Sequence, residues 1–309
     1  MAKADRGPKP RFKPGKNKSV PSDNGTSDGG PHAWPPRRAF WLAALLALAA
    51  FFVLYGLLAY IVLPLTWTHY EHQKGLSGFT MVTRTAQDIP GDPINVGLVG
   101  TKDDVLCAMH AAAWYPADPI TFRSSVEIVG SVVLDRPYRD APVSNLFYQN
   151  RREDLAFEKP DGSSADRRQH VRFWEVLKRG NEGRPVWLGS ATFDRGVGLS
   201  RYTAQVTHHI GPDIDAERDR LADDLKTAKV VEAIYEVSGI GPTLAGRNGE
   251  GDPYYTDGEI KFSRLVTGCN STVETTAVLD NPPLVKIKNE AWKAIAGMLQ
   301  TDERAAASK

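Results

Sequence analysis

The chain combines two patterns of hydrophobic and polar positions. Residues 39–65 form a continuous apolar stretch without a charged side chain, whereas the rest shows short apolar runs separated by Gly, Pro, Asn and Asp. About 20 apolar residues in helical form span the hydrocarbon core of a bilayer. The first pattern therefore predicts a transmembrane helix, and the second predicts a globular domain built from short elements.

The globular part begins with a strand followed by a helix. Residues 94–100 read as a short apolar strand, and Thr101 and Asp104 have the spacing of a helix cap with an acid in the first turn. Prolines after Trp114 end this helix. Residues 120–134 are predicted to be a second helix or a mixed segment, followed by a loop at residues 136–144.

The middle of the chain reads as antiparallel strands bounded by turn residues. A helix at 214–228 has Ile214, Leu221, Ala222 and Leu225 on one face, and a loop is expected at 239–257. Strands and helices do not alternate strictly, so the predicted class is α+β, with a mostly antiparallel sheet and flanking helices after one transmembrane helix. The predicted strands are 146–149, 155–159, 169–177, 186–193, 202–210, 230–237 and 258–266, with one more helix after 286.

Charge is concentrated before the apolar stretch. Residues 1–38 carry nine basic and three acidic side chains, a net of +6, while the whole chain is +1. This Pro-, Gly- and Ser-rich leader predicts disorder. Because Arg37 and Arg38 abut the apolar stretch, we expect a cytoplasmic N-terminus and an extracytoplasmic C-terminal domain. The expected organisation is a basic tail (1–38), a transmembrane helix (39–65), a linker (66–82), an α+β domain (83–267) and a C-terminal extension with one helix (268–309).

Cys107 and Cys269 are the two cysteines of the sequence. They would be able to pair in an oxidising exterior. Two cysteines so far apart in sequence are more often separate, small buried residues, and we expect that arrangement here.

Adjacent histidines in "QVTHHIGPDIDAERD" raise the question of a metal or acid/base site. In a strand, His208 and His209 point to opposite faces, and neither H-x-H nor H-E-x-x-H spacing is present, so we expect no metal site. His208 lies on the apolar face, as a hydrogen-bonded core histidine does. His209, on the polar face before a helix N-terminus, is the better candidate. Asp213 is a natural N-cap for the helix that follows.

Two further stretches carry candidate ligand-binding or acid/base groups. In "ATFDRGVGLS" the glycines predict a hairpin, and the functional alternative is that Asp194 and Arg195 are presented on a loop at the sheet edge. In "QHVRFWEV", His170 shares a strand face with Arg172 and Trp174, which suits an anionic group and equally a packed interface.

Several functional classes lack support. "SGIGPTLAG" has neither Walker spacing nor a following helix, and no serine lies in a G-x-S-x-G turn. We therefore expect no nucleotide loop, no covalent nucleophile and no cofactor. The basic leader is better explained by membrane flanking than by nucleic-acid binding.

Five phrases, in order, carry a family resemblance: "WYPADP", "RREDLAFEKP", "HVRFW", "WLGSATFDRGVGLS" and "THHIGPDIDAERD". On these phrases the chain resembles the LssY C-terminal domain family, and we expect the resemblance to cover roughly residues 83–265. The family takes its name from a protein encoded beside a bacterial type I secretion system, and the resemblance implies no defined biochemical activity. Related domains are fused to DedA-like membrane proteins and phosphatidic-acid-phosphatase-type domains, and since this chain shows neither region, it is not expected to share a lipid phosphatase activity.

Two hypotheses follow. The leading one is a single-pass membrane protein whose exterior domain binds an anionic lipid, another envelope ligand or a membrane-protein partner without catalysis, with Arg172, Arg195 and Trp174 as candidate ligand-binding residues. The alternative is a membrane-tethered hydrolase for phosphate esters or a lipid-linked substrate. Its candidate catalytic residues are His170, Asp194, His209 and Asp213.

Overall fold

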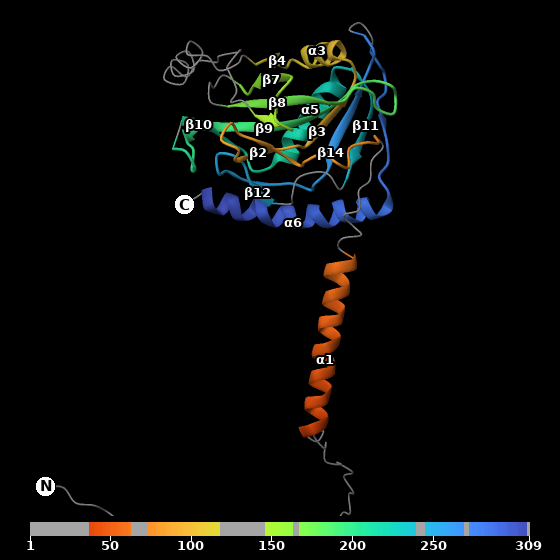
Figure 1. Cartoon of the computed structure of the whole chain (residues 1–309), viewed down its shortest axis with the longest axis vertical. Coiled ribbons are helices and arrows are strands. Elements are labelled where there is room, and N and C mark those ends of the chain that lie inside the picture. The colour runs from red at the N-terminus through yellow and green to blue at the C-terminus, as the bar shows by residue number, and fades with distance from the viewer. Residues whose placement is uncertain are drawn as a thin grey trace, which may run out of the picture. The chain divides into compact units, whose positions relative to one another are not determined.

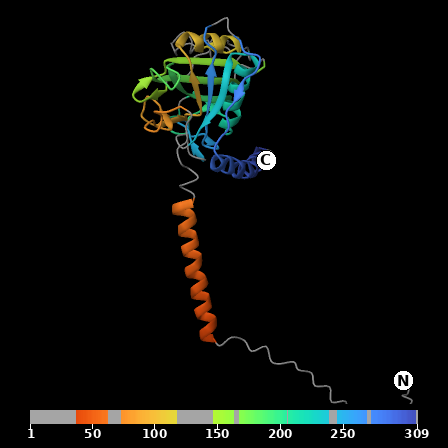
Figure 2. The same cartoon turned by 90° about the vertical axis from the view of Figure 1, so that its right-hand side faces the viewer.

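The computed structural model describes residues 37–62, 73–117, 146–162, 167–204, 206–238, 245–268 and 272–307. The chain divides into two compact units, Met1–Tyr55 and Gly56–Lys309. The segments predicted at 120–134 and 136–144 lie outside the described residues, as does most of the basic tail. The described helices and strands appear in Figures 1 and 2.

The apolar stretch forms a helix. α1 (Arg37–Leu57) continues into the π-helical turn η1 (Leu58–Val62), and its apolar side chains are exposed. Residues Arg38–Val62 are long and apolar enough to cross a membrane. The predicted helix is therefore present, and the end of the predicted span beyond Val62 lies outside the described residues.

A nine-stranded mixed sheet forms the centre of the globular unit. Its order is β15-β11-β14-β3-β9-β8-β7-β4, with β10 paired to β9. All pairs are antiparallel except β14 with β3 and β11 with β15. The predicted α+β class is confirmed. The strands are β3 (Val96–Val99), β4 (Tyr115–Pro116), β7 (Leu155–Pro160), β8 (Arg168–Leu177), β9 (Val186–Leu199), β10 (Val206–Ile210), β11 (Val231–Val237), β14 (Ile260–Leu265) and β15 (Ala277–Val278).

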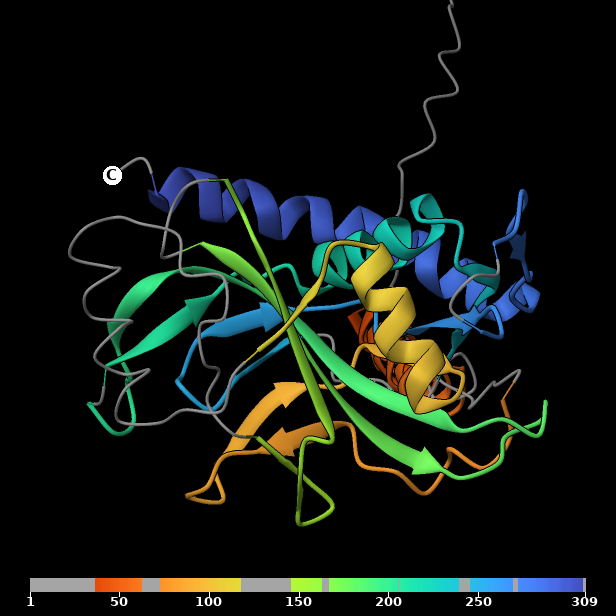
Figure 3. The same ribbon diagram turned by 90° about the horizontal axis from the view of Figure 1, so that it is seen from above.

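Both faces of this sheet are covered by other elements. Alternate residues of its strands point to opposite sides, so each face contributes its own set of side chains to the packing. On one face, Val171 and Phe173 pack with α3 (Lys102–Ala111) and α5 (Ile214–Thr227). On the other, Trp174 and Leu188 pack with residues of a smaller sheet, which lies across the main sheet from α5 (Figure 3). The smaller sheet has the order β2-β1-β5-β6, comprising Pro90–Pro93, Val82–Arg84, Phe147–Tyr148 and Arg151–Arg152.

Local capping signals set the helix starts. Thr101 accepts a hydrogen bond from the Asp104 amide while the Asp104 carboxylate accepts one from the Thr101 amide, which completes a capping box. Asp213 accepts from the Ala216 amide at 3.0 Å and caps α5. Both predicted caps are confirmed. The last helix, α6 (Pro283–Ala307), runs along the end of the domain opposite α3 (Figures 1 and 2).

Two predicted local features are wrong. The stretch from Asp194 to Gly198 is not a turn, because β9 continues to Leu199, pairing with β8 as far as Asp194 and with β10 from there on. The turn follows at residues 201–203. The predicted loop at 239–257 contains a hairpin, β12 (Ala245–Arg247) and β13 (Pro253–Tyr255).

The expectation of two separate thiols is also wrong, since Cys107 is disulfide-bonded. The other cysteine of the sequence, Cys269, lies outside the described residues. The physical reason is topological: β14 runs parallel to β3, so the chain leaving β14 emerges beside the start of α3. There the Gly268 amide donates to the Asp104 carboxylate at 2.8 Å, one helical turn before Cys107.

Candidate functional site

Five charged or titratable side chains gather on four neighbouring strands of the main sheet. Glu158 of β7 lies opposite His170 of β8, and Arg168 of β8 lies opposite Asp194 of β9. His208 of β10 completes the group, which we call the His–Asp cluster. Four members are buried, and the His208 side chain is 20% exposed.

Asp194 is the centre of the cluster. Its Oδ2 lies 3.0 Å from His170 Nδ1, 3.3 Å from His208 Nδ1 and 3.8 Å from Arg168 Nε. Burial by itself raises the pKa of this carboxyl, but His170, His208 and Arg168 together outweigh burial and hold the pKa well below its usual range. Asp194 is therefore ionised throughout the physiological pH range.

His208 is held in its neutral form. Burial is the largest effect on its pKa and lowers it to about 4, although Asp194 opposes the shift. Arg168 Nη2 lies 3.0 Å from His208 Nε2, and because a guanidinium only donates, Nε2 is the accepting nitrogen. Nδ1 then carries the proton and faces Asp194. The lone pair that a general base would use is already occupied by Arg168.

A small cavity of about 50 Å³ opens beside the cluster. His170, Asp194 and His208 line it together with Arg172, Asp92 of β2 and Asn248, which follows β12. A buried water occupies roughly 10–15 Å³ on this scale, so the cavity has room for one compact polar group.

Arg172 is an incompletely paired charge at this cavity. It is only 6% exposed, its Nε has no hydrogen-bond partner among the described residues, and its Nη1 lies 3.5 Å from Asp92 Oδ2. Burial raises the pKa of Asp92, with Arg172 and the 3.1 Å hydrogen bond from Asn248 acting in the opposite direction. Because its pKa is raised, the Asp92 carboxylate is a weaker partner for Arg172. The Arg172 guanidinium also has more N–H donors than this long contact uses.

Only part of the candidate set meets at this site. Arg172, His170 and Asp194 line the cavity, and Asp194 is buried within β9 rather than presented on a loop. Arg195, the next residue, is exposed. Trp174 lies fully buried in the core on the smaller-sheet side, where its indole donates to the Arg151 carbonyl at 3.2 Å.

The other two candidate catalytic residues lie elsewhere. His209 points away from the cluster, with its Nδ1 2.8 Å from Asp252 Oδ1 and its ring packed where a Cβ on Gly198 would lie. Asp213 caps α5. The alternation of β10 separates the two histidines as expected, and it is His208 that faces His170, with 6.2 Å between the ring centres.

The predicted set of site residues left out several members of the site. Glu158 and Arg168 join it through strand pairing, and Asp92 and Asn248 come from segments that are not adjacent to β8 in sequence. Arg168 had a detectable signal, because it lies two residues before His170 and therefore shares its strand face.

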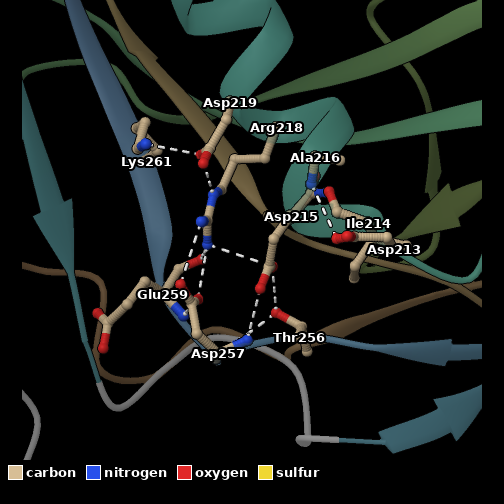
Figure 4. Close-up of polar contacts among 12 residues, drawn as sticks. Asp213, Ile214, Asp215, Ala216, Arg218, Asp219, Thr256, Asp257, Glu259 and Lys261 are labelled. Atoms are coloured by element: carbon tan, nitrogen blue, oxygen red, sulfur yellow. Dashed lines mark hydrogen bonds and ion pairs between the residues drawn. The ribbon is translucent and has the colours of Figure 1, made fainter. Parts of the chain in front are cut away.

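A second buried polar network surrounds the start of α5 (Figure 4). Arg218, 3% exposed, binds both oxygens of Asp257 at 2.6 and 3.1 Å and also contacts Asp215 and Asp219. Asp215 accepts from the Thr256 hydroxyl and the Asp257 amide. These acids and Arg218 hold α5 against the segment before β14.

The described residues contain no group of three or more His, Cys, Asp and Glu side chains arranged to hold a metal ion. In the His–Asp cluster, the Arg168 guanidinium lies between the two carboxylates, 3.5 Å from Glu158 and 3.8 Å from Asp194. Arg168 therefore supplies a positive charge to both carboxylates of the cluster.

Comparisons with known proteins identify the domain. No curated protein and no solved structure matches the chain. The family model described as LssY C-terminus matches residues 73–260. That match covers more than half of the 309 residues, including the smaller sheet, both polar networks and most of the main sheet. The chain therefore belongs to the LssY C-terminal family.

Proposed function

We propose that this protein is a single-pass membrane protein whose α+β domain binds an anionic group of an envelope ligand, with Arg172 as the principal contact. The observation that carries the proposal is the buried Arg172 guanidinium, which lines a cavity and, among the described residues, makes a long contact to Asp92. Desolvating a charge is costly unless it is paired. A phosphate or carboxylate entering this cavity would supply the missing partner.

The surroundings of Arg172 suit a small anion. Thr85, Thr192 and Thr207 line the same cavity and can offer hydroxyl donors. Asp194 is already matched by His170, His208 and Arg168, so its charge opposes an entering anion less than an unpaired carboxylate would. The volume admits a single compact group, so the rest of the ligand would lie outside the cavity.

Binding is favoured over hydrolysis by the same geometry. A hydrolase using His170, Asp194, His209 and Asp213 together would need all four side chains to reach one substrate. His209 and Asp213 are engaged elsewhere, with Asp252 and with the α5 amide of Ala216. Within the cluster, the accepting nitrogen of His208 faces Arg168. These contacts support a binding role for the domain.

Replacing Arg172 by glutamine is expected to weaken the binding of inorganic phosphate or acetate at least tenfold, because the buried positive charge is removed. Isothermal titration calorimetry on the full chain in detergent micelles measures the effect. The matched control is Arg195→Gln, which removes an exposed arginine from the neighbouring strand and should leave the affinity unchanged. No saturable binding to the unchanged protein, or equal affinity in the Arg172 variant, would contradict the proposal.

The proposal places the domain outside the cytoplasm. Support comes from the lysines and arginines before α1 and from the disulfide at Cys107, since disulfides persist mainly in oxidising compartments.

Accordingly, cells that are acid-quenched and denatured should yield a chain that does not react with a polyethylene-glycol maleimide until a reductant is added, after which two groups attach. The measurement is a gel-mobility shift, and denaturation removes protection of thiols by burial. A Cys107→Ser variant, with one unpaired thiol left, should react without reductant and serves as the control. Modification of the unchanged chain before reduction would argue for a cytoplasmic domain.

A further inference from the structure

Exposed apolar side chains are concentrated near the C-terminal helix. Among described residues after η1, eight large apolar side chains are exposed, and five of them lie between Val278 and Ile295. On α6, Leu284, Ile287 and Ile295 are 53%, 62% and 48% exposed. An apolar stripe of this kind on a soluble surface marks an interaction site.

Helical geometry separates this stripe from the face that holds α6 on the domain. Val285, Lys288 and Trp292 are buried and follow the spacing i, i+3, i+7. Leu284, Ile287, Ala291 and Ile295 follow i, i+3, i+7, i+11 and form an exposed stripe beside the buried face; we call it the α6 stripe.

Polar contacts fix the rotation of α6. Lys288 donates to the Asp257 carbonyl at 2.9 Å and pairs with Glu259, while Asn289 donates to Glu236 at 3.2 Å. Lys288 and Glu259 are both buried, so turning the helix would leave their charges unpaired. The α6 stripe is therefore kept exposed and cannot be buried by rolling the helix.

The membrane is the partner that the chain itself brings close. Ten residues, 63–72, separate the end of η1 from Gln73, the first described residue of the domain. Fully extended, such a segment spans roughly 40 Å. With α1 in a bilayer, the domain stays near that surface at a high effective concentration, which makes even weak insertion favourable. This step rests on the proposed membrane anchoring.

The exposed lysines of α6 do not flank the α6 stripe. Lys286 pairs with Asp280 at 3.1 Å and Lys293 pairs with Glu290 at 2.8 Å, on a side of the helix different from that of the α6 stripe. The apolar residues alone suit the interfacial region, where an amphipathic helix buries its apolar face. We propose that the α6 stripe inserts into the interfacial region of the bilayer that holds α1.

The test uses the full chain reconstituted into phosphatidylcholine–phosphatidylglycerol vesicles, with the native disulfide kept oxidised. Ile287→Cys carries an environment-sensitive NBD label. Leu199→Cys is the matched control, because Leu199 is an equally exposed apolar residue of β9 (61%). We expect a blue-shifted emission at position 287 and at least twofold stronger quenching by nitroxide-labelled lipids than at position 199.

Flotation of the vesicles tests membrane anchoring independently of the insertion of the α6 stripe. A chain that floats but shows equal quenching at both positions overturns the α6 inference and leaves the anchor intact. A chain that does not float overturns both. A blue shift at position 287 that disappears on dilution of the protein in the membrane, without lipid quenching, identifies a second copy of the chain as the partner and also overturns the inference.

Discussion

Replacing Arg218 by glutamine is expected to lower the free energy of unfolding by about 3–5 kcal/mol, the cost of breaking a buried ion pair by removing one partner. Arg218 makes a bidentate contact to Asp257 and single contacts to Asp215 and Asp219. Without the guanidinium, these carboxylates face one another at the start of α5. Urea denaturation of the full chain in micelles, followed by tryptophan fluorescence, measures the change.

The loss should depend on pH in a defined direction. Burial is the main reason that the pKa of Asp215 is raised to about 6; Asp257 adds to the rise and Arg218 opposes it. A raised carboxyl pKa stabilises the fold below the unfolded value and costs stability as pH rises through the folded value. Removing Arg218 raises that pKa further, so the variant should lose more stability at pH 8 than at pH 5.

Arg84→Gln is the matched control for this variant. The Arg84 side chain is 54% exposed and pairs at 3.0 Å with Asp88, whose side chain is 82% exposed. Exposed pairs of this kind contribute less than about 1 kcal/mol. Equal losses in the two variants would show that the network around Arg218 does not hold α5 in place.

The second large effect is expected for Asp194→Asn, with a loss of about 2–4 kcal/mol at pH 7. Asparagine keeps the shape of the side chain but removes the charge that His170, His208 and Arg168 all face. Glu158 remains beside Arg168 and His170, which is why the expected loss is smaller than for Arg218. The same denaturation experiment measures it.

The loss in this variant, like the loss at Arg218, should be larger at neutral pH than in acid, although the pKa shift behind it has the opposite direction. The pKa of Asp194 is lowered in the folded protein, so its contribution is present above the unfolded value of about 4 and is lost as pH falls through the folded value. The difference between the variant and the unchanged protein should therefore shrink on acidification. Asp88→Asn, whose side chain is 82% exposed in its pair with Arg84, is the control and should change stability by less than about 1 kcal/mol. A difference that grows toward low pH would contradict this assignment.

Local patterns were sufficient for much of the fold. The capping box at Thr101 and the cap at Asp213 were predictable because a cap depends on residues three positions apart. The strands β7, β8, β11 and β14 followed from short apolar runs between turn residues, and α1 followed from the length of its apolar stretch.

Local patterns failed where long-range pairing decides the conformation. Gly196 and Gly198 are typical of a turn, yet β10 pairs with them and keeps β9 extended. The hairpin of β12 and β13 was missed because glycine and proline dominate its sequence. The disulfide at Cys107 depends on the parallel pairing of β14 with β3, which no local signal reports.

Residues close together along the chain were enough to predict the apolar helix, the α+β class, the helix caps and the divergence of His208 from His209. Three other features follow from the folded structure: which histidine joins His170 and Asp194, how Asp92 reaches Arg172, and how Lys288 fixes the rotation of α6 so that its apolar stripe stays exposed. These depend on strand register and on packing between distant segments. A shift of one residue in register would turn every side chain of a strand to the other face, and no short stretch of sequence specifies that register alone.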